Sequence, residues 1–221
     1  VKVVERRGVV GGAAVTEEFH PGFQNSVCAY TVSLLESKVI SDLRLADHGL
    51  RIVERPMANF LPLPDGRSLS LHGDLARDRA EVARFSAGDG EALADYRATL
   101  DRLADVFRRF VLETPPEFGG TWVDGLRAWG AGRRLKGLGI AGLRDLADIA
   151  TLSAADFLGR WFESDPVKAL FAFDGVVGTM ASPYTPGTAY VLLHHAMGQV
   201  NGRRGAWGHA IGGMGAISGA M

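Results

Sequence analysis

The feature that most restricts the fold is a short apolar run at the start of the chain, which ends in a carboxylate and precedes a glycine pair. Val1–Val4 predict a buried strand, and Glu5 follows it directly. In a dinucleotide-binding fold, a carboxylate at a strand end accepts hydrogen bonds from the two hydroxyls of an adenosine ribose. Gly11 and Gly12 lack a Cβ, so their backbone amides can come close to a phosphate.

The residues around this motif add candidate cofactor contacts and leave two interpretations open. Arg6 and Arg7 are predicted to neutralise a pyrophosphate or to lie over an adenine, and Ala13 extends the glycine pair. The plainer interpretation is a turn at the glycines and a simple strand-end charge at Glu5. The glycine fingerprint G-x-G-x-x-G is not visible in the sequence, so the residues alone favour the plainer interpretation.

The remaining chain predicts a small sheet followed by many helices. Pro64-Asp65-Gly66 is a strong turn signal between two short apolar segments, Asn59–Leu63 and Ser68–Leu71. From Asp74 onward apolar residues recur at helical spacing, and Asp89 and Ser153 are predicted helix caps. We therefore expect a mixed α+β and α/β architecture in which this small sheet begins a second structural unit.

Composition and charge restrict the classes of function. The net charge of −1 gives no overall field that would attract nucleic acid. Cys28 is the one cysteine of the chain, which argues against thiol redox chemistry and favours a reducing, cytoplasmic compartment. No signal peptide and no apolar run long enough to span a bilayer are visible. His194 and His195 lack further ligands at helical spacing, so we expect packed histidines and no metal site.

Glu5, Arg7, Gly11-Gly12 and Thr16 form a pattern that resembles the second-strand motif of the FAD-dependent amine oxidase and phytoene dehydrogenase superfamily. Further segments are similar to that superfamily in the same order along the chain. They are His20–Phe23, Asn25–Cys28, Phe60–Leu71, Trp161–Lys168, Ser182-Pro183, Pro186–Tyr190, Trp207-Gly208 and Gly212–Gly215. The last five resemble the phytoene dehydrogenase-like branch often named pyridine nucleotide-disulphide oxidoreductase domain-containing.

This resemblance implies an internal fragment of a two-part flavoprotein. Residues 1–48 would be part of a Rossmann-like FAD-binding domain without its first strand and glycine loop. Residues 49–221 would be a substrate domain that is truncated at its C-terminal end. The implied chemistry is hydride transfer from substrate to FAD, and the fragment by itself is expected to bind little FAD and to be inactive. The implied FAD contacts are Glu5, Arg6, Arg7, Gly11, Gly12 and Ala13.

A second glycine pair predicts the substrate pocket. Gly212 and Gly213 free the backbone to turn sharply beside a ligand, and Met214 is a soft, unbranched side chain suited to an apolar wall. His209 precedes this turn and is predicted to face the pocket. The expected substrate is a small, apolar molecule. A turn needed only for folding, and an ordinary loop histidine, stay open as alternatives.

Two other functions compete with the flavoprotein. One is a non-catalytic interaction module that keeps the fold and has lost the cofactor. The other is a membrane-surface protein, because residues 122–138 interleave Trp122 and Trp129 with Arg127, Arg133 and Arg134. Glycines in that stretch weaken a helix, so a surface helix or loop of the substrate domain is the favoured interpretation. Catalytic residues and oligomeric state are not predicted.

Overall fold

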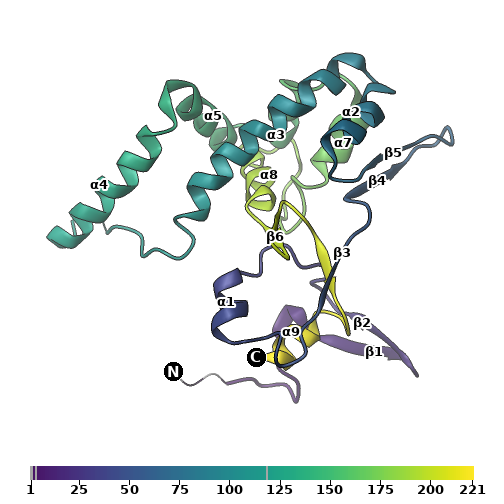
Figure 1. Ribbon diagram of the computed structural model, residues 1–221, viewed down its shortest axis with the longest axis vertical. Helices are drawn as coiled ribbons and strands as arrows, with labels where there is room; N and C mark the ends of the chain where they lie inside the picture. Colours follow the sequence, from purple (N-terminus) through teal and green to yellow (C-terminus); the bar gives the residue numbers. More distant parts are fainter. Residues whose placement is uncertain (1, 3, 118) are drawn as a thin grey trace. The chain divides into compact units, whose positions relative to one another are not determined.

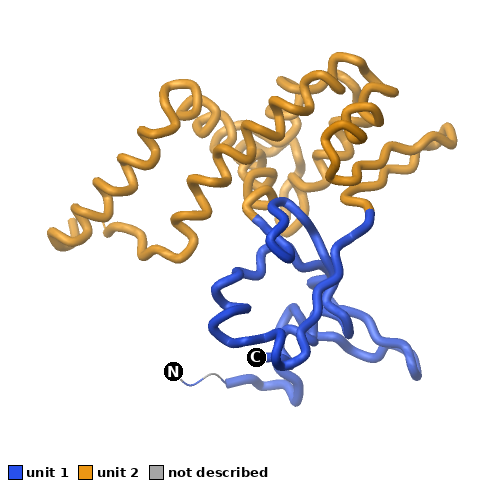
Figure 2. Tube along the Cα trace, viewed as in Figure 1, with its two compact units in different colours: residues 1–56, 198–221 blue, residues 57–197 orange. Residues whose placement is uncertain are grey.

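The computed structural model of the chain describes residue 2, residues 4–117 and residues 119–221. Two compact units are present, each described by itself (Figure 2). Unit 1 comprises residues 1–56 and 198–221, and unit 2 comprises residues 57–197. This division differs from the predicted boundary after residue 48, because residues 49–56 and 198–221 belong to the first unit. The cause is a pairing between distant segments, which no local pattern encodes.

Unit 1 consists of short strands, short helices and turns (Figure 1). Its elements are η1 (Gly12–Ala14), β1 (Thr16–His20), β2 (Phe23–Ser26), α1 (Ser37–Asp42), β3 (Ile52–Glu54), β6 (Gln199–Val200), β7 (Arg203–Arg204), β8 (Gly208–Ala210) and α9 (Gly215–Ala220). The strands form antiparallel pairs, β1 with β2, β3 with β8, and β6 with β7. The β1–β2 hairpin confirms the hairpin predicted around Pro21-Gly22.

The core of unit 1 is built from both segments of the chain. Its buried residues are Val32, Leu45, Leu50, Ala210, Met214, Ile217 and Ala220. The pairing of β3 with β8 brings these segments together, with Val53 opposite His209. Burial of this apolar surface is the main favourable term for the unit, so residues 198–221 are structurally part of it.

The buried strand predicted at residues 1–4 is not found in the described part of the chain. Val1 and Val3 lie outside the described residues, whereas Lys2 and Val4 belong to no strand and Val4 is 80% exposed. A buried strand needs a neighbour that pairs with its backbone groups, and no described strand pairs with this segment. The partial Rossmann-like portion therefore stays a prediction.

Unit 2 is a group of helices with one hairpin (Figure 1). Its elements are β4 (Asn59–Pro62), β5 (Ser68–Leu71), α2 (Leu75–Ala83), α3 (Ala87–Arg108), α4 (Trp122–Lys136), α5 (Gly139–Thr151), α6 (Ala154–Gly159), α7 (Asp165–Ala172) and α8 (Ala189–Ala196). The β4–β5 hairpin confirms the turn predicted at Pro64-Asp65-Gly66, where Gly66 has a φ of 83°. The core contains apolar side chains from β5, α2, α3 and α5–α8.

The helix starts agree in part with the sequence prediction. Ser153 caps α6 as predicted, because its hydroxyl accepts a hydrogen bond from the backbone N–H of Asp156. The prediction that Asp89 caps the long helix is wrong, since Ser86 caps α3 instead. Asp89 is buried, and its carboxylate accepts hydrogen bonds from the backbone N–H groups of Glu163 and Ser164. It thus connects α3 to the segment that enters α7.

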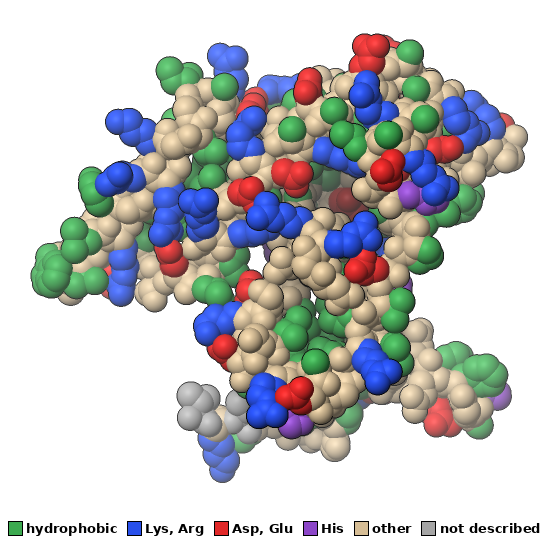
Figure 3. All heavy atoms as spheres, viewed as in Figure 1, with side chains coloured by type: hydrophobic (Ala, Val, Ile, Leu, Met, Phe, Trp, Pro, Cys, Tyr) green, Lys and Arg blue, Asp and Glu red, His purple; other side chains and the backbone are tan. Residues whose placement is uncertain are grey.

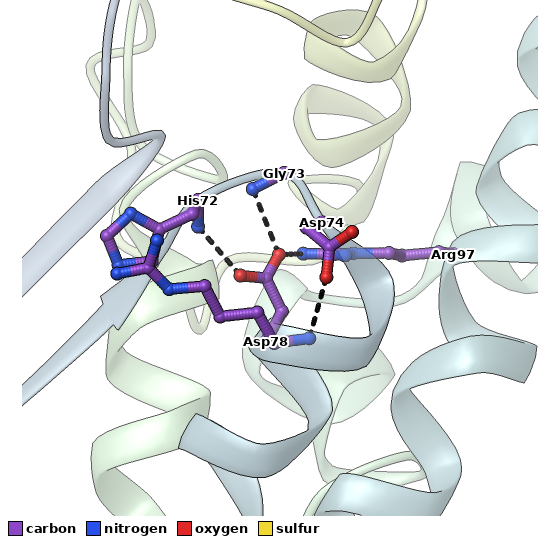
Figure 4. A network of polar contacts seen from close by, with 6 residues as sticks. His72, Gly73, Asp74, Asp78 and Arg97 are labelled. Carbon is purple, nitrogen blue, oxygen red and sulfur yellow. Dashed lines mark hydrogen bonds and ion pairs between the residues drawn. The ribbon is translucent and has the colours of Figure 1, made fainter.

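A second buried carboxylate connects the hairpin of unit 2 to two helices (Figure 4). Asp78 of α2 is fully buried and accepts hydrogen bonds from the backbone N–H groups of His72 at 2.7 Å and Gly73 at 3.1 Å. The Arg97 guanidinium of α3 donates to the same carboxylate at 2.7 Å. The buried charge is therefore paired and hydrogen-bonded, as burial of a carboxylate requires.

Candidate functional site

The predicted cofactor residues at the start of the chain lie in an exposed segment that is held by ionic contacts. The Glu5 carboxylate accepts a hydrogen bond from the backbone N–H of Arg7 at 2.9 Å. The Arg7 guanidinium pairs with Glu17 of β1, and Arg6 is exposed. A phosphate that recruits Arg7 would therefore compete with Glu17 for the guanidinium.

The two glycines of the first pair have different roles. Gly11 and Gly12 both have positive φ, 129° and 54°, and lead into the short helix η1. A Cβ on Gly11 would lie 2.7 Å from the Ser218 hydroxyl oxygen, so this glycine is required for packing against α9. A Cβ on Gly12 would meet nothing within 4 Å, and Gly12 and Ala13 are exposed. Gly12 is therefore the position whose backbone is open to a ligand.

A cavity of about 480 Å³ lies within unit 1 and brings together the four residues of the predicted substrate pocket. His209, Gly212, Gly213 and Met214 all line it. The other lining residues are Thr16, Gln24, Asn25, Ser26, Tyr30 and Ala210. The wall formed by these described residues thus combines neutral hydrogen-bonding groups with a few apolar side chains and contains no Lys, Arg, Asp or Glu.

The β1–β2 hairpin holds the second glycine turn in place. The Ser26 hydroxyl accepts a hydrogen bond from the Met214 backbone N–H at 3.0 Å, and the Thr16 hydroxyl accepts one from Gly215 at 2.9 Å. Thr16 and Ser26 are register partners on adjacent strands, so both hydroxyls reach the turn. A Cβ on Gly213 would lie 2.4 Å from the Thr16 hydroxyl oxygen. The turn therefore serves folding as well as the cavity wall.

His209 is fixed by two contacts at the edge of the cavity. Its Nε2 lies 3.1 Å from the Nε of Arg55, and its Nδ1 lies 3.1 Å from the carbonyl oxygen of Tyr30. Arg55 also lies over the rings of Tyr30 and Trp207. Sequence reasoning did not identify Arg55. Its partner His209 is 154 positions away, and no local motif marks the pair.

The histidine pair of unit 2 belongs to a packed helix. His195 is buried on α8, and its Nε2 lies 3.3 Å from the carbonyl oxygen of Val177. Burial lowers the pKa of His195, partly opposed by this hydrogen bond. Within the described ranges, no three His, Cys, Asp or Glu side chains are grouped so that they could hold a metal ion.

Comparisons with known proteins give an oxidoreductase context. No protein-family model matches the chain. It is 40% identical over 233 residues to pyridine nucleotide-disulfide oxidoreductase domain-containing protein 2 of Rattus norvegicus, and 40% identical over 237 residues to the protein of that name in Mus musculus. Both alignments cover 99% of this chain and 40% of the relative, so the chain spans well under half the length of these relatives.

A shorter match points in the same direction. The chain is 33% identical over 108 residues to one of the limonene dehydrogenase polypeptides of Castellaniella defragrans, which covers 48% of this chain and 20% of that protein. The names of these relatives support an oxidoreductase family for the chain. Each helix in the described part of the chain is too short or too polar to cross a membrane.

Proposed function

We propose that the chain is part of an FAD-dependent oxidoreductase of the phytoene dehydrogenase-like branch, in which a small substrate transfers a hydride to the flavin. The single observation that carries the proposal is the arrangement within unit 1. Gly12, whose backbone is open, begins η1, and Thr16, which lines the cavity, begins β1 directly after it. One short stretch of chain thus joins a candidate phosphate turn to a candidate substrate cavity.

The residues present fit a dinucleotide at this place. An added Cβ at Gly12 would occupy space that is open in the structure, which leaves room for a phosphate beside the backbone. Arg6 and Arg7 would supply positive charge to the pyrophosphate. Glu5 would accept hydrogen bonds from ribose hydroxyls, as a carboxylate does in dinucleotide folds. When bound, FAD would accept the hydride, whereas this chain's residues position the substrate and exclude water.

The test uses a chimera, because the relatives are longer than this chain. We expect the rat relative, with its matching segment replaced by this chain, to copurify with FAD. Gly12→Ala in the chimera is expected to weaken FAD binding by about tenfold or more, because the Cβ occupies the approach to the phosphate. Fluorescence titration of the apoprotein with FAD measures the affinity.

Gly66→Ala is the matched control for this prediction. Gly66 also has positive φ, and a Cβ there also meets nothing within 4 Å, so the two changes impose similar backbone strain. Equal FAD affinity in the Gly12 and Gly66 variants would remove Gly12 from the cofactor site. A folded chimera that binds no flavin would instead favour the non-catalytic interaction module.

Helix α4 favours membrane-surface binding as a second candidate function. Trp122 and Trp129 are 77% and 62% exposed, and the Arg133 guanidinium lies 4.8 Å from the Trp129 ring centroid. Figure 3 shows hydrophobic side chains at one end of α4, with Lys and Arg side chains farther along it. Exposed indole rings beside arginines suit the interface of an anionic bilayer.

We expect the chain to cosediment with vesicles of phosphatidylcholine and phosphatidylserine. Replacing Trp122 and Trp129 together by Ser is expected to weaken that binding by about tenfold, since two apolar rings no longer enter the interface. Tyr184→Ser, at another exposed aromatic residue of unit 2, is the control and should leave binding unchanged. Unchanged sedimentation of the double variant would exclude α4 as the contact.

A further inference from the structure

Arg55 follows strand β3 and is half-buried between two aromatic rings of unit 1. Its guanidinium carbon lies 5.2 Å from the centroid of the Trp207 ring and 5.9 Å from that of the Tyr30 ring. Its backbone N–H donates to the carbonyl oxygen of Trp207 at 3.1 Å. These contacts hold the guanidinium in one orientation before any ligand arrives.

The partner of the Arg55 side chain is a neutral histidine. The Nε–H of Arg55 can only donate, so the Nε2 of His209, 3.1 Å away, must be the acceptor. The ring proton of His209 is then on Nδ1 and is donated to the carbonyl oxygen of Tyr30. His209 therefore gives Arg55 no negative counter-charge.

No carboxylate of the described residues pairs with Arg55. The adjacent Glu54 pairs with Arg203 at 2.5 Å instead, and its other carboxylate oxygen faces Asn201. The terminal Nη1 and Nη2 groups of Arg55 donate to no described residue. An oriented guanidinium with an open edge of paired N–H groups matches the two oxygens of a carboxylate.

Arg55 contacts two residues of the cavity wall, Tyr30 and His209. The described wall itself carries no charged side chain, so Arg55 supplies positive charge to it from directly behind these two residues. We propose that the substrate of this cavity carries a carboxylate and that Arg55 binds it. The inference rests on the proposed function and deepens it, because it adds an acidic group to a substrate expected to be small and largely apolar.

The test measures ligand binding to the chain itself by NMR, with hexanoate as the probe and hexanamide as its neutral match. Hexanoate should shift the signals of the Arg55 Nε–H and the His209 ring nitrogens saturably. Hexanamide should bind about tenfold more weakly or worse, because it lacks the charge that a guanidinium pairs with. Arg55→Met should reduce hexanoate affinity by a similar factor, whereas Arg44→Met, just after the exposed end of α1, should not.

Equal affinity for hexanoate and hexanamide, or unchanged hexanoate binding in Arg55→Met, would overturn the proposal. Inorganic phosphate that shifts the same signals at least as strongly would show a general anion site and overturn the carboxylate assignment. If Arg55→Met does not fold, the comparison of the two ligands on the wild-type chain still decides. None of these measurements needs FAD, so this proposal and the flavin proposal fail separately.

Discussion

Replacing Asp78 by Ala is expected to lower the free energy of unfolding of unit 2 by about 3–5 kcal/mol, the cost of removing one partner from a buried ion pair. The substitution leaves the backbone N–H groups of His72 and Gly73 without their acceptor in a buried place. It also removes the carboxylate that neutralises Arg97, whose side chain is 27% exposed and gains only partial hydration. Chemical denaturation of the full chain, followed by circular dichroism, measures the loss.

Two variants separate the causes of this loss. Asp78→Asn keeps one acceptor oxygen and removes the charge, so it should cost less than Ala, about 1–3 kcal/mol. Asp95→Ala on the exposed face of α3 removes a carboxylate that accepts no hydrogen bond within the described structure, and its effect should stay within about 0.5 kcal/mol. A loss of under about 1 kcal/mol for Asp78→Ala would show that the network adds little to stability.

Gly213→Ala is expected to destabilise unit 1 more than Gly212→Ala does. Both glycines have a left-handed backbone, with φ of 80° and 88°, so both variants share a strain of about 1–2 kcal/mol. At Gly212 the nearest atom to a new Cβ is 3.7 Å away, whereas at Gly213 the Thr16 hydroxyl oxygen is 2.4 Å away. Thr16 is β-branched and its hydroxyl holds the Gly215 N–H, so it cannot move without losing that bond.

The expected difference between these two variants is about 1–3 kcal/mol, the cost of a lost buried hydrogen bond and local overpacking. Amide hydrogen exchange of residues in β1 and α9 measures it within unit 1. The Gly213 variant should also lose saturable ligand binding in the cavity, since the wall moves. Equal protection in the two variants would mean that the approach of the turn to Thr16 does not limit stability.

Local chemistry in the sequence determined the short-range features of this protein. The turn at Pro64-Asp65-Gly66 and the cap at Ser153 were predicted correctly, because both depend on residues within a few positions of one another. The cap of α3 was predicted at Asp89, three residues beyond the true cap, because Ser and Asp both suit that role and only the folded chain places Asp89 beside Glu163 and Ser164.

The sequence also marked His209 and the glycine turn that follows it, and the structure places these residues on one cavity. Only the tertiary structure shows what holds them. Thr16 and Ser26 reach the turn from nearly 200 positions away, and Arg55 reaches His209 across 154 positions. The same non-local pairing of β3 with β8 assigns residues 198–221 to unit 1. Local propensity carries no information on such contacts, because they form only when distant apolar segments share one core.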